Sequence, residues 1–295
     1  MMAVNAACAS AGAVVNTQPW DVAAHGWNQH AALIHRWLHS VTQTMLDDAH
    51  IGPGARVLDV AAGAGDQTVD IAHRIGPTGW VLATDVSPSI LALGQKNFDA
   101  SGLLQVTTRL ADAQTLGLAG SNFDAAVCRL GLMFCCTPLV ALRQIRAALK
   151  PHGRLTALVF GRPENNPCLA MTLGAAREHA GQAEALNMNA SRSDSPGSLM
   201  SLGKPGLLDE LMQSAGFEGV TTRYVSVPFH AASAEQYVEF LRTSASPVIE
   251  ILAPLPIAAK QAAWRDITEK LEAFSTPQGW MGPNELLQCV AVAPG

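Results

Sequence analysis

The chain has 295 residues, of which 48% are hydrophobic and 15% are charged, and its formal net charge at pH 7 is −5. This composition describes a well-packed globular protein with a sizeable core, and it excludes an intrinsically disordered chain. The negative charge argues against a nucleic-acid partner, which requires a basic face, and no apolar run reaches the roughly 18 residues that a membrane span needs.

The first fifty residues predict a tail followed by a helix. Residues 1–18 are rich in alanine and lack Lys and Arg, so we expect a flexible tail without the basic start of a secretory signal. Over residues 21–48 apolar side chains recur at three- and four-residue steps, which indicates an amphipathic helix. The recurring residues are Ile34, Leu38, Val41 and Met45.

The next segment predicts a strand, a turn of small residues, a helix and a second strand. Residues 57–60 are an apolar run typical of a strand buried on both faces, and residues 61–65 (AAGAG) form a turn in which side chains almost vanish. We expect Asp66 to cap the helix and Asp85 to follow the second strand, residues 80–84. Such a βαβ unit holds a nucleoside, because the turn admits its polar tail and the acid binds its ribose hydroxyls.

The spacing of the small residues and the acids distinguishes between nucleosides. A dinucleotide site needs a third glycine so that helix and strand pack closely, but Thr68 stands at that position. Asp59, four residues before Gly63, would also repel a pyrophosphate. The pattern Asp59-x-Ala61-x-Gly63-x-Gly65 therefore suits a ligand with a cationic end.

Further strands extend this unit into a sheet. The pattern predicts strands over residues 105–110, 123–129 and 154–160, with helices between them. Five strands that alternate with helices over about a hundred residues indicate a doubly wound parallel sheet. In the second half we expect a helix over residues 205–215 and two more strands. These strands are residues 220–227 and 286–292.

With these motifs in place, the chain resembles class I S-adenosylmethionine-dependent methyltransferases of the ubiquinone/menaquinone-biosynthesis type, in the broad group that methylates small molecules. The first motif of that class is D-x-G-x-G-x-G, and Ala61 takes its first glycine position. The resemblance is specific over residues 54–161 and looser elsewhere. It implies a Rossmann-like α/β fold, a doubly wound seven-stranded sheet whose last strand lies antiparallel between strands five and six.

The resemblance also divides the chain into parts. It implies a helical cover over residues 19–50, an S-adenosylmethionine-binding core over residues 51–162, and the remainder of the sheet with substrate-covering helices over residues 163–295. Trp20 or Trp27 on the cover either lies near the cofactor's sulfonium, where an aromatic face attracts positive charge, or only packs the helix.

The cofactor contacts implied by the resemblance fall on the motif residues. Asp59 offers negative charge to the cofactor's ammonium, Asp85 binds both ribose hydroxyls, and Asp112 orients the adenine. The glycines of the turn bring backbone against the cofactor. The implied cofactor-binding residues are Asp59, Ala61, Gly63, Gly65, Asp85, Val86, Asp112, Ala113 and Arg129.

The expected activity is methyl transfer to an apolar or aromatic small molecule, with oxygen or carbon as the favoured acceptor atom and S-adenosylhomocysteine as the released product. The displacement is in line, so the protein mainly aligns the reactants and excludes water. An acceptor hydroxyl or carbon acid also needs a base, and His25 and His30 are the candidates by their ordinary pKa. Arg129, at the end of its strand, either stabilises an enolate or phenolate or forms a surface salt bridge.

Two other classes of function stay open. A nicotinamide-dependent reductase is disfavoured by Thr68 and Asp59. A catalytically silent S-adenosylmethionine-binding protein would carry the same binding motifs as an enzyme. Methylation of nucleic-acid bases is disfavoured, because residues 128–131 (CRLG) stand where such relatives carry an N-P-P-Y type tetrad.

No metal or disulfide is expected from the sequence. His35 and His39 are one helical turn apart, but no third ligand at metal-site spacing accompanies them. Six cysteines without a C-x-x-C pair indicate neither a zinc site nor a disulfide framework. We therefore expect a cytoplasmic protein. Monomer and homodimer are both left open.

Overall fold

The computed structural model describes residues 17–182 and 196–295. The first sixteen residues of the expected tail lie outside the described part of the chain. Gln18, which we had assigned to the tail, already begins a helix.

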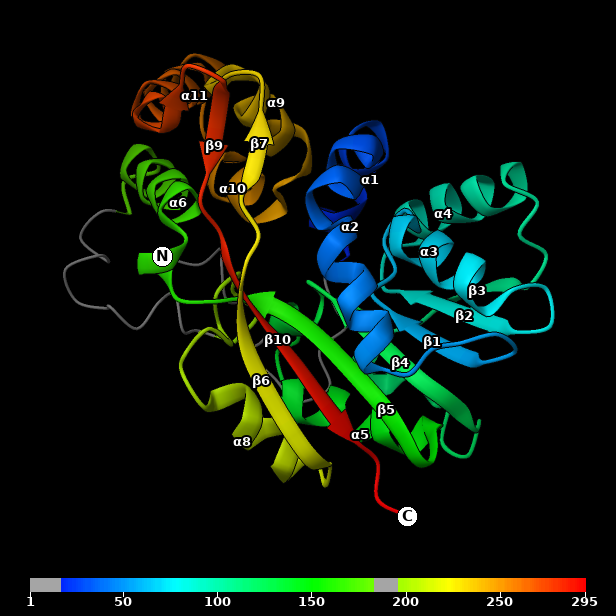
Figure 1. Cartoon of the computed structure of the whole chain (residues 1–295). Helices are drawn as coiled ribbons and strands as arrows, with labels where there is room; N and C mark the ends of the chain where they lie inside the picture. The colour runs from blue at the N-terminus through cyan, green and yellow to red at the C-terminus, as the bar shows by residue number, and fades with distance from the viewer. Residues whose placement is uncertain (1–16, 183–195) are drawn as a thin grey trace.

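A seven-stranded sheet forms the centre of the molecule, in the order β3-β2-β1-β4-β5-β10-β6 (Figure 1). Strand β1 pairs in parallel with β2 and β4, whereas β10 is antiparallel to both β5 and β6. The doubly wound sheet with its last strand between strands five and six is therefore confirmed. The strands are β1 (Arg56–Val60), β2 (Trp80–Asp85), β3 (Val106–Leu110), β4 (Phe123–Arg129), β5 (Leu149–Phe160), β6 (Glu218–Ser226) and β10 (Glu285–Val292).

Helices cover both faces of this sheet, as the alternation of strands and helices predicts. Figure 1 shows α2, α3 and α4 on one face, and α5 and α8 on the other. The central strands are consequently buried on both sides, with Val57 and Leu58 fully enclosed. The helices are α2 (Ala31–Asp48), α3 (Asp66–Ile75), α4 (Pro88–Ala100), α5 (Pro138–Ala148) and α8 (Leu207–Ser214).

The N-terminal segment consists of two helices, so the prediction of one helix over residues 21–48 is wrong at its start. Helix α1 (Gln18–Gln29) ends at His30, and α2 begins at the next residue. The predicted apolar stripe of α2 is confirmed, because Leu38 and Met45 are completely buried in the main core. Helix α2 therefore contributes to the main core.

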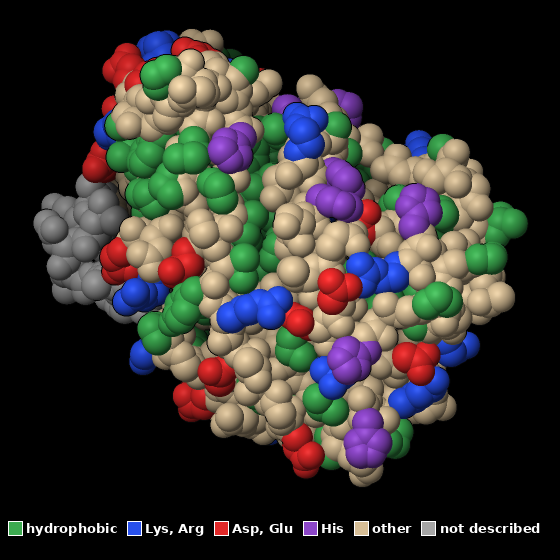
Figure 2. Space-filling model, viewed as in Figure 1, with side chains coloured by type: hydrophobic (Ala, Val, Ile, Leu, Met, Phe, Trp, Pro, Cys, Tyr) green, Lys and Arg blue, Asp and Glu red, His purple; other side chains and the backbone are tan. Residues whose placement is uncertain are grey.

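Between β6 and β10 the chain forms a lobe of three helices and a small sheet. The sheet, in the order β7-β9-β8, was not predicted. Helix α6 (Pro167–His179) packs against α11 of this lobe, and hydrophobic side chains gather where the lobe meets the N-terminal helices (Figure 2). The lobe comprises β7 (Phe229–Ala231), α9 (Ala234–Ser244), α10 (Ser246–Leu252), α11 (Ile257–Leu271), β8 (Ser275–Thr276) and β9 (Gly279–Gly282).

Helix α1 joins this lobe to the main sheet. It contacts α4 on one side and α9 and α10 on the other. At Gly26 the approach is so close that a Cβ atom would lie 2.1 Å from the carbonyl oxygen of Thr243. No helix in the described ranges is both long and apolar enough to cross a membrane.

Because Leu38 is fully buried, we expect Leu38→Ala to lower the free energy of unfolding by about 2–5 kcal/mol, the usual cost of truncating a core leucine. Arg36→Ala, on the exposed side of the same helix, serves as the control and should change it by less than about 0.5 kcal/mol. Chemical denaturation measures both. Equal, small effects would mean that α2 is not part of the core.

Candidate functional site

A cavity of about 860 Å³ opens where the carboxyl ends of β1, β2 and β4 meet the N-terminal helices and the lobe. This is the edge at which open α/β sheets bind ligands, and the volume is typical of small-molecule sites. Eight of the nine predicted cofactor-binding residues line this cavity. They are Ala61, Gly63, Gly65, Asp85, Val86, Asp112, Ala113 and Arg129.

The turn after β1 takes left-handed backbone conformations at Ala61, Gly63 and Gly65. At Gly65 a Cβ atom would lie 2.3 Å from the ring of Phe98, so only glycine fits. Ala61 takes the first glycine position of the motif, and the residue opposite its methyl group is Gly131. A Cβ atom on residue 131 would lie 2.3 Å from that methyl group, so the methyl group fits because residue 131 is glycine. The departure from the glycine pattern is thus compensated from the loop after β4.

Asp85 connects this turn to the loop after β2. Its carboxylate accepts a hydrogen bond from the Gly63 N–H (2.9 Å) and another from the Ser87 N–H (2.9 Å). Burial raises the pKa of Asp85, although these backbone donors act in the opposite direction. The carboxylate also faces the cavity, where each oxygen retains capacity to accept a bond from a ligand.

A hydrogen bond between a hydroxyl and a carboxylate extends this network to the N-terminal helices. Ser87 caps α4 by accepting from the Ile90 N–H, as its position in the sequence indicates. Its hydroxyl donates to Asp21 of α1 at 2.5 Å. Helix α1 is therefore held over the loop that carries Asp85.

Arg129 is buried and forms no surface salt bridge, which corrects one of the two alternatives for this residue. Its guanidinium donates to both carboxylate oxygens of Asp66 (2.6 Å each) and to the Thr42 hydroxyl (2.8 Å). Asp66 is the first residue of α3, and the left-handed Gly65 occupies the capping position. The prediction that Asp66 caps the helix is therefore wrong by one residue.

Asp59 lies beneath the turn, fully buried, and does not line the cavity. It accepts hydrogen bonds from the Gln67 amide and from the Thr68 hydroxyl (2.6 Å). Burial raises the pKa of Asp59 to about 7, against the lowering effect of Thr68. The structure thus gives this carboxylate a role in fixing the start of α3. A direct contact with a ligand's ammonium stays a prediction.

The two candidate bases do not line the cavity. His25 is exposed. His30 hydrogen-bonds with the Thr243 hydroxyl (3.1 Å) and packs edge-on against Phe240, and burial lowers its pKa. Their role as a base stays a prediction. Trp20 and Trp27 of α1 both line the cavity.

Sequence reasoning missed a carboxylate in the cavity wall. Glu250 of α10 lines the cavity, and burial raises its pKa. No motif surrounds this residue, and only the folding of the lobe onto α1 brings it to the site. Arg177 of α6 and Glu164, which precedes this helix, also line the cavity.

The cysteines near the site are not nucleophiles. Burial raises the pKa of Cys128 to about 12 and raises that of Cys135 further, so both stay protonated at neutral pH. Cys136 is disulfide-bonded, which corrects the expectation that the chain carries no disulfide. Cys168 and Cys289 are free thiols, as are Cys128 and Cys135.

Comparisons with known proteins agree with the geometry. The sequence profile of the ubiE/COQ5 methyltransferase family matches residues 27–178, more than half of the chain. Over 134 residues the chain is 35% identical to the ubiquinone/menaquinone biosynthesis C-methyltransferase UbiE of Teredinibacter turnerae, covering 45% of this chain and 53% of that protein. The chain thus matches about half the length of this relative.

Solved structures share the fold at low sequence identity. The YcgJ protein of Bacillus subtilis superposes with a TM-score of 0.57 at 15% identity, over 87% of this chain and 99% of that one. The [4+2]-cyclase SpnF superposes with a TM-score of 0.53 at 17% identity, over 91% and 93%. These likenesses concern the fold alone, because one fold supports several chemistries.

The pKa of Asp59 leads to a pH-dependent prediction. Its pKa rises from 3.8 to about 7 on folding, so folding favours the protonated carboxyl. The resulting contribution to the free energy of unfolding is fully present at about pH 4 and is lost as the pH rises through about 7. The free energy of unfolding of wild type, measured relative to Asp59→Asn, should therefore fall by up to about 1.4 kcal/mol per pH unit across this interval.

Denaturant titrations at a series of pH values measure this difference. Asp99→Asn, at an exposed position of α4, is the control and should run parallel to wild type. A difference between wild type and Asp59→Asn that is independent of pH would show that Asp59 is ionised throughout.

Proposed function

Because this chain belongs to the ubiE/COQ5 methyltransferase family, we propose that it transfers a methyl group from S-adenosylmethionine to an apolar or aromatic small molecule and releases S-adenosylhomocysteine. The observation that carries the proposal is one cavity that is lined both by the motif residues and by apolar side chains of the N-terminal helices, α6 and α10. We assign the cofactor to the motif residues and the acceptor to the apolar ones. The similar protein of Teredinibacter turnerae is a C-methyltransferase by name, which favours carbon over oxygen as the acceptor atom.

The motif residues in the cavity wall fit the cofactor. Gly63 and Gly65 leave the backbone of the first turn free of side chains, and Asp85 presents carboxylate oxygens suited to ribose hydroxyls. Asp112 and Ala113 line the same cavity and would bind the adenine. When bound, the cofactor supplies an electrophilic methyl group on a sulfonium.

Arg129 and Asp66 contribute charge to the cavity. The Arg129 guanidinium lines the cavity while it holds Asp66, so both signs of charge are available to the amino-acid tail of the cofactor. Their mutual pairing fixes the two groups before a ligand arrives. We propose that Arg129 acts on the carboxylate of that tail and on negative charge that develops on the acceptor.

The apolar part of the wall fits an apolar acceptor. Trp27 from the N-terminal helices, Leu173 from α6 and Ile251 from α10 line the cavity. Aromatic and aliphatic side chains with a small number of polar groups are typical of sites for such ligands. Helices α1 and α10 also exclude water from the reacting atoms, which is the main demand of an in-line methyl transfer.

Glu250 is the base that we favour for this acceptor. It lines the cavity from α10, beside the apolar Ile251. Burial raises its pKa, which brings the carboxylate closer to neutral pH, where a general base is most effective. His25 and His30 stay alternatives. A base on α10 would explain why the lobe is folded against the sheet.

The same proposal concerns the setting of the enzyme. We propose a cytoplasmic enzyme, monomeric or homodimeric, that acts without nucleic acid. The net charge of −5 supports action without nucleic acid.

Asp85 provides the test of the cofactor. Charge-assisted bonds to two ribose hydroxyls contribute on the order of 1.5–3 kcal/mol each. Asp85→Asn should therefore weaken binding of S-adenosylmethionine and of S-adenosylhomocysteine by at least about 100-fold in calorimetry. It should also lower the melting temperature, since an amide accepts only one of the two backbone bonds.

The control for this test is Asp99→Asn, an equivalent change at an exposed position, which should bind like wild type. If Asp85→Asn binds both sulfur compounds as tightly as wild type, a residue other than Asp85 binds the ribose. Wild-type protein that binds NADH and neither sulfur compound would overturn the methyltransferase proposal. Binding without a methylated product, traced with labelled cofactor in extracts, would indicate a silent binding protein.

Glu250 provides the test of the base. Glu250→Gln should lower the rate of transfer by about 10²–10⁴-fold while the affinity for S-adenosylmethionine stays the same, because the residue lines the part of the cavity that we assign to the acceptor. Glu210→Gln on the exposed side of α8 is the matched control. His25→Ala and His30→Ala are measured in the same assay. If the rate of transfer falls steeply in one of these histidine variants and not in Glu250→Gln, that histidine is the base.

A further inference from the structure

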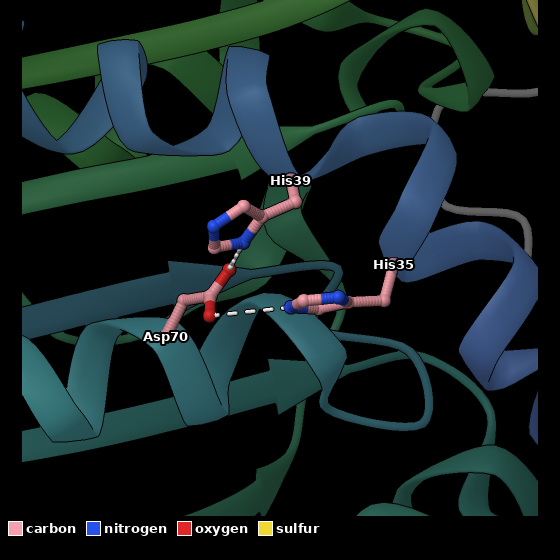
Figure 3. Close-up of side chains that lie close together, drawn as sticks. All are labelled: His35, His39 and Asp70. Carbon is pink, nitrogen blue, oxygen red and sulfur yellow. Dashed lines mark hydrogen bonds and ion pairs between the residues drawn. The ribbon is translucent and has the colours of Figure 1, made fainter.

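Three ligand-bearing side chains converge between α2 and α3 (Figure 3). His35 and His39 lie one turn apart on α2, with ring centroids 4.5 Å apart. Asp70 of α3 points at both, with His35 Nε2 3.5 Å from one carboxylate oxygen and His39 Nδ1 3.2 Å from the other. One ligand atom from each of the three residues lies within 4.8 Å of the other two.

We propose that His35, His39 and Asp70 bind a divalent transition-metal ion, with Zn²⁺ as the reference ion. The sequence alone predicts no metal site, because a third ligand is missing near the two histidines. The fold supplies that ligand from a different helix, thirty-one residues after His39. The proposal does not depend on methyl transfer.

The donor set determines the class of metal. Two imidazoles and one carboxylate are ligands of three-residue zinc sites, in which water takes a fourth position. Paired histidines at i and i+4 on one helix face are a known zinc-binding arrangement. Imidazole nitrogen disfavours Mg²⁺ and Ca²⁺, which prefer oxygen ligands.

The distances are compatible with tetrahedral coordination. Metal–ligand bonds of about 2.0–2.2 Å place neighbouring ligand atoms roughly 3.3–3.6 Å apart in a tetrahedron. The two nitrogen–oxygen distances, 3.5 Å and 3.2 Å, run to the two different oxygens of Asp70 and are close to this spacing. All three ligand atoms lie within 4.8 Å of one another, so an ion would draw them closer together when it binds.

Charge and exposure also favour an ion here. The Asp70 side chain is only 11% exposed, and within the described residues it makes ion pairs with these two imidazoles and with no Lys or Arg. The histidine side chains are 44% and 46% exposed, so an ion reaches them from solvent. A divalent cation would place two positive charges beside this carboxylate.

The consequence of binding is a clamp between two parts of the proposed active site. Helix α2 contributes Leu38 and His35 itself to the cavity wall, and α3 begins at the turn that carries Gly65. An ion held by both helices would fix their spacing. Because it binds only the folded chain, it would also raise the melting temperature.

Calorimetry on the untagged full chain, stripped with a chelator, tests the site with Zn²⁺. Wild type should bind one ion per chain. His39→Ala, His35→Ala and Asp70→Asn should each weaken binding by more than about tenfold, the smallest effect expected even for a residue that only orients a ligand. His230→Ala, at an exposed position on β7, is the control and should bind like wild type.

A second measurement keeps the test decisive. Co²⁺ in place of Zn²⁺ gives a visible spectrum that reports nitrogen and oxygen ligands, and this spectrum should disappear in Asp70→Asn, whose shape matches wild type. The proposal is overturned if wild type takes up no ion, or if all three variants bind as tightly as the control. Neither readout involves methyl transfer, so failure of the proposed enzymatic function would leave this result intact.

Discussion

The site depends on one carboxylate that holds two loops together. Asp85 accepts the N–H groups of Gly63 and Ser87, and these residues belong to the loops after two neighbouring parallel strands. An unpaired backbone N–H in a buried place is costly, so the acid stabilises both turns in one geometry. The same residue lines the cavity. In the function that we propose, architecture and cofactor binding therefore share a single group.

The N-terminal helices and the lobe build on this arrangement. Ser87 reaches Asp21 of α1, and α1 in turn lies against α9 at Gly26. The loop of the βαβ unit is thus connected through one helix to Thr243, 156 residues after Ser87 in the chain. A ligand that orders the loop would act on the cavity's cover through these contacts.

The local features and the strand order were predictable from the sequence and the family resemblance, but the long-range side-chain contacts were not. Strands, the small-residue turn, Asp85 and the Ser87 cap depend on neighbours within a few residues, so their patterns are visible in the chain. The break at His30 has no proline or glycine to signal it. Glu250 and Asp70 join their sites only through tertiary packing, and neither is part of a motif. The surface salt bridge that was one alternative for the buried Arg129 is wrong for the same reason. The partner of Arg129, Asp66, is sixty-three residues away in the chain.

The electrostatics of the turn explain why a ligand with a cationic end suits it. Asp59 and Asp85 are both buried, burial raises the pKa of each, and a neighbouring carboxylate adds to the shift in both cases: Asp66 beside Asp59 and Asp21 beside Asp85. Arg129 offsets part of this charge at Asp59. A ligand that brings positive charge to this end of the cavity would lower both pKa values. Binding and ionisation are then linked, because a cation favours the charged form of the acids and the charged acids favour the cation. A pyrophosphate would have the opposite effect, and this difference separates the site from one that binds a dinucleotide.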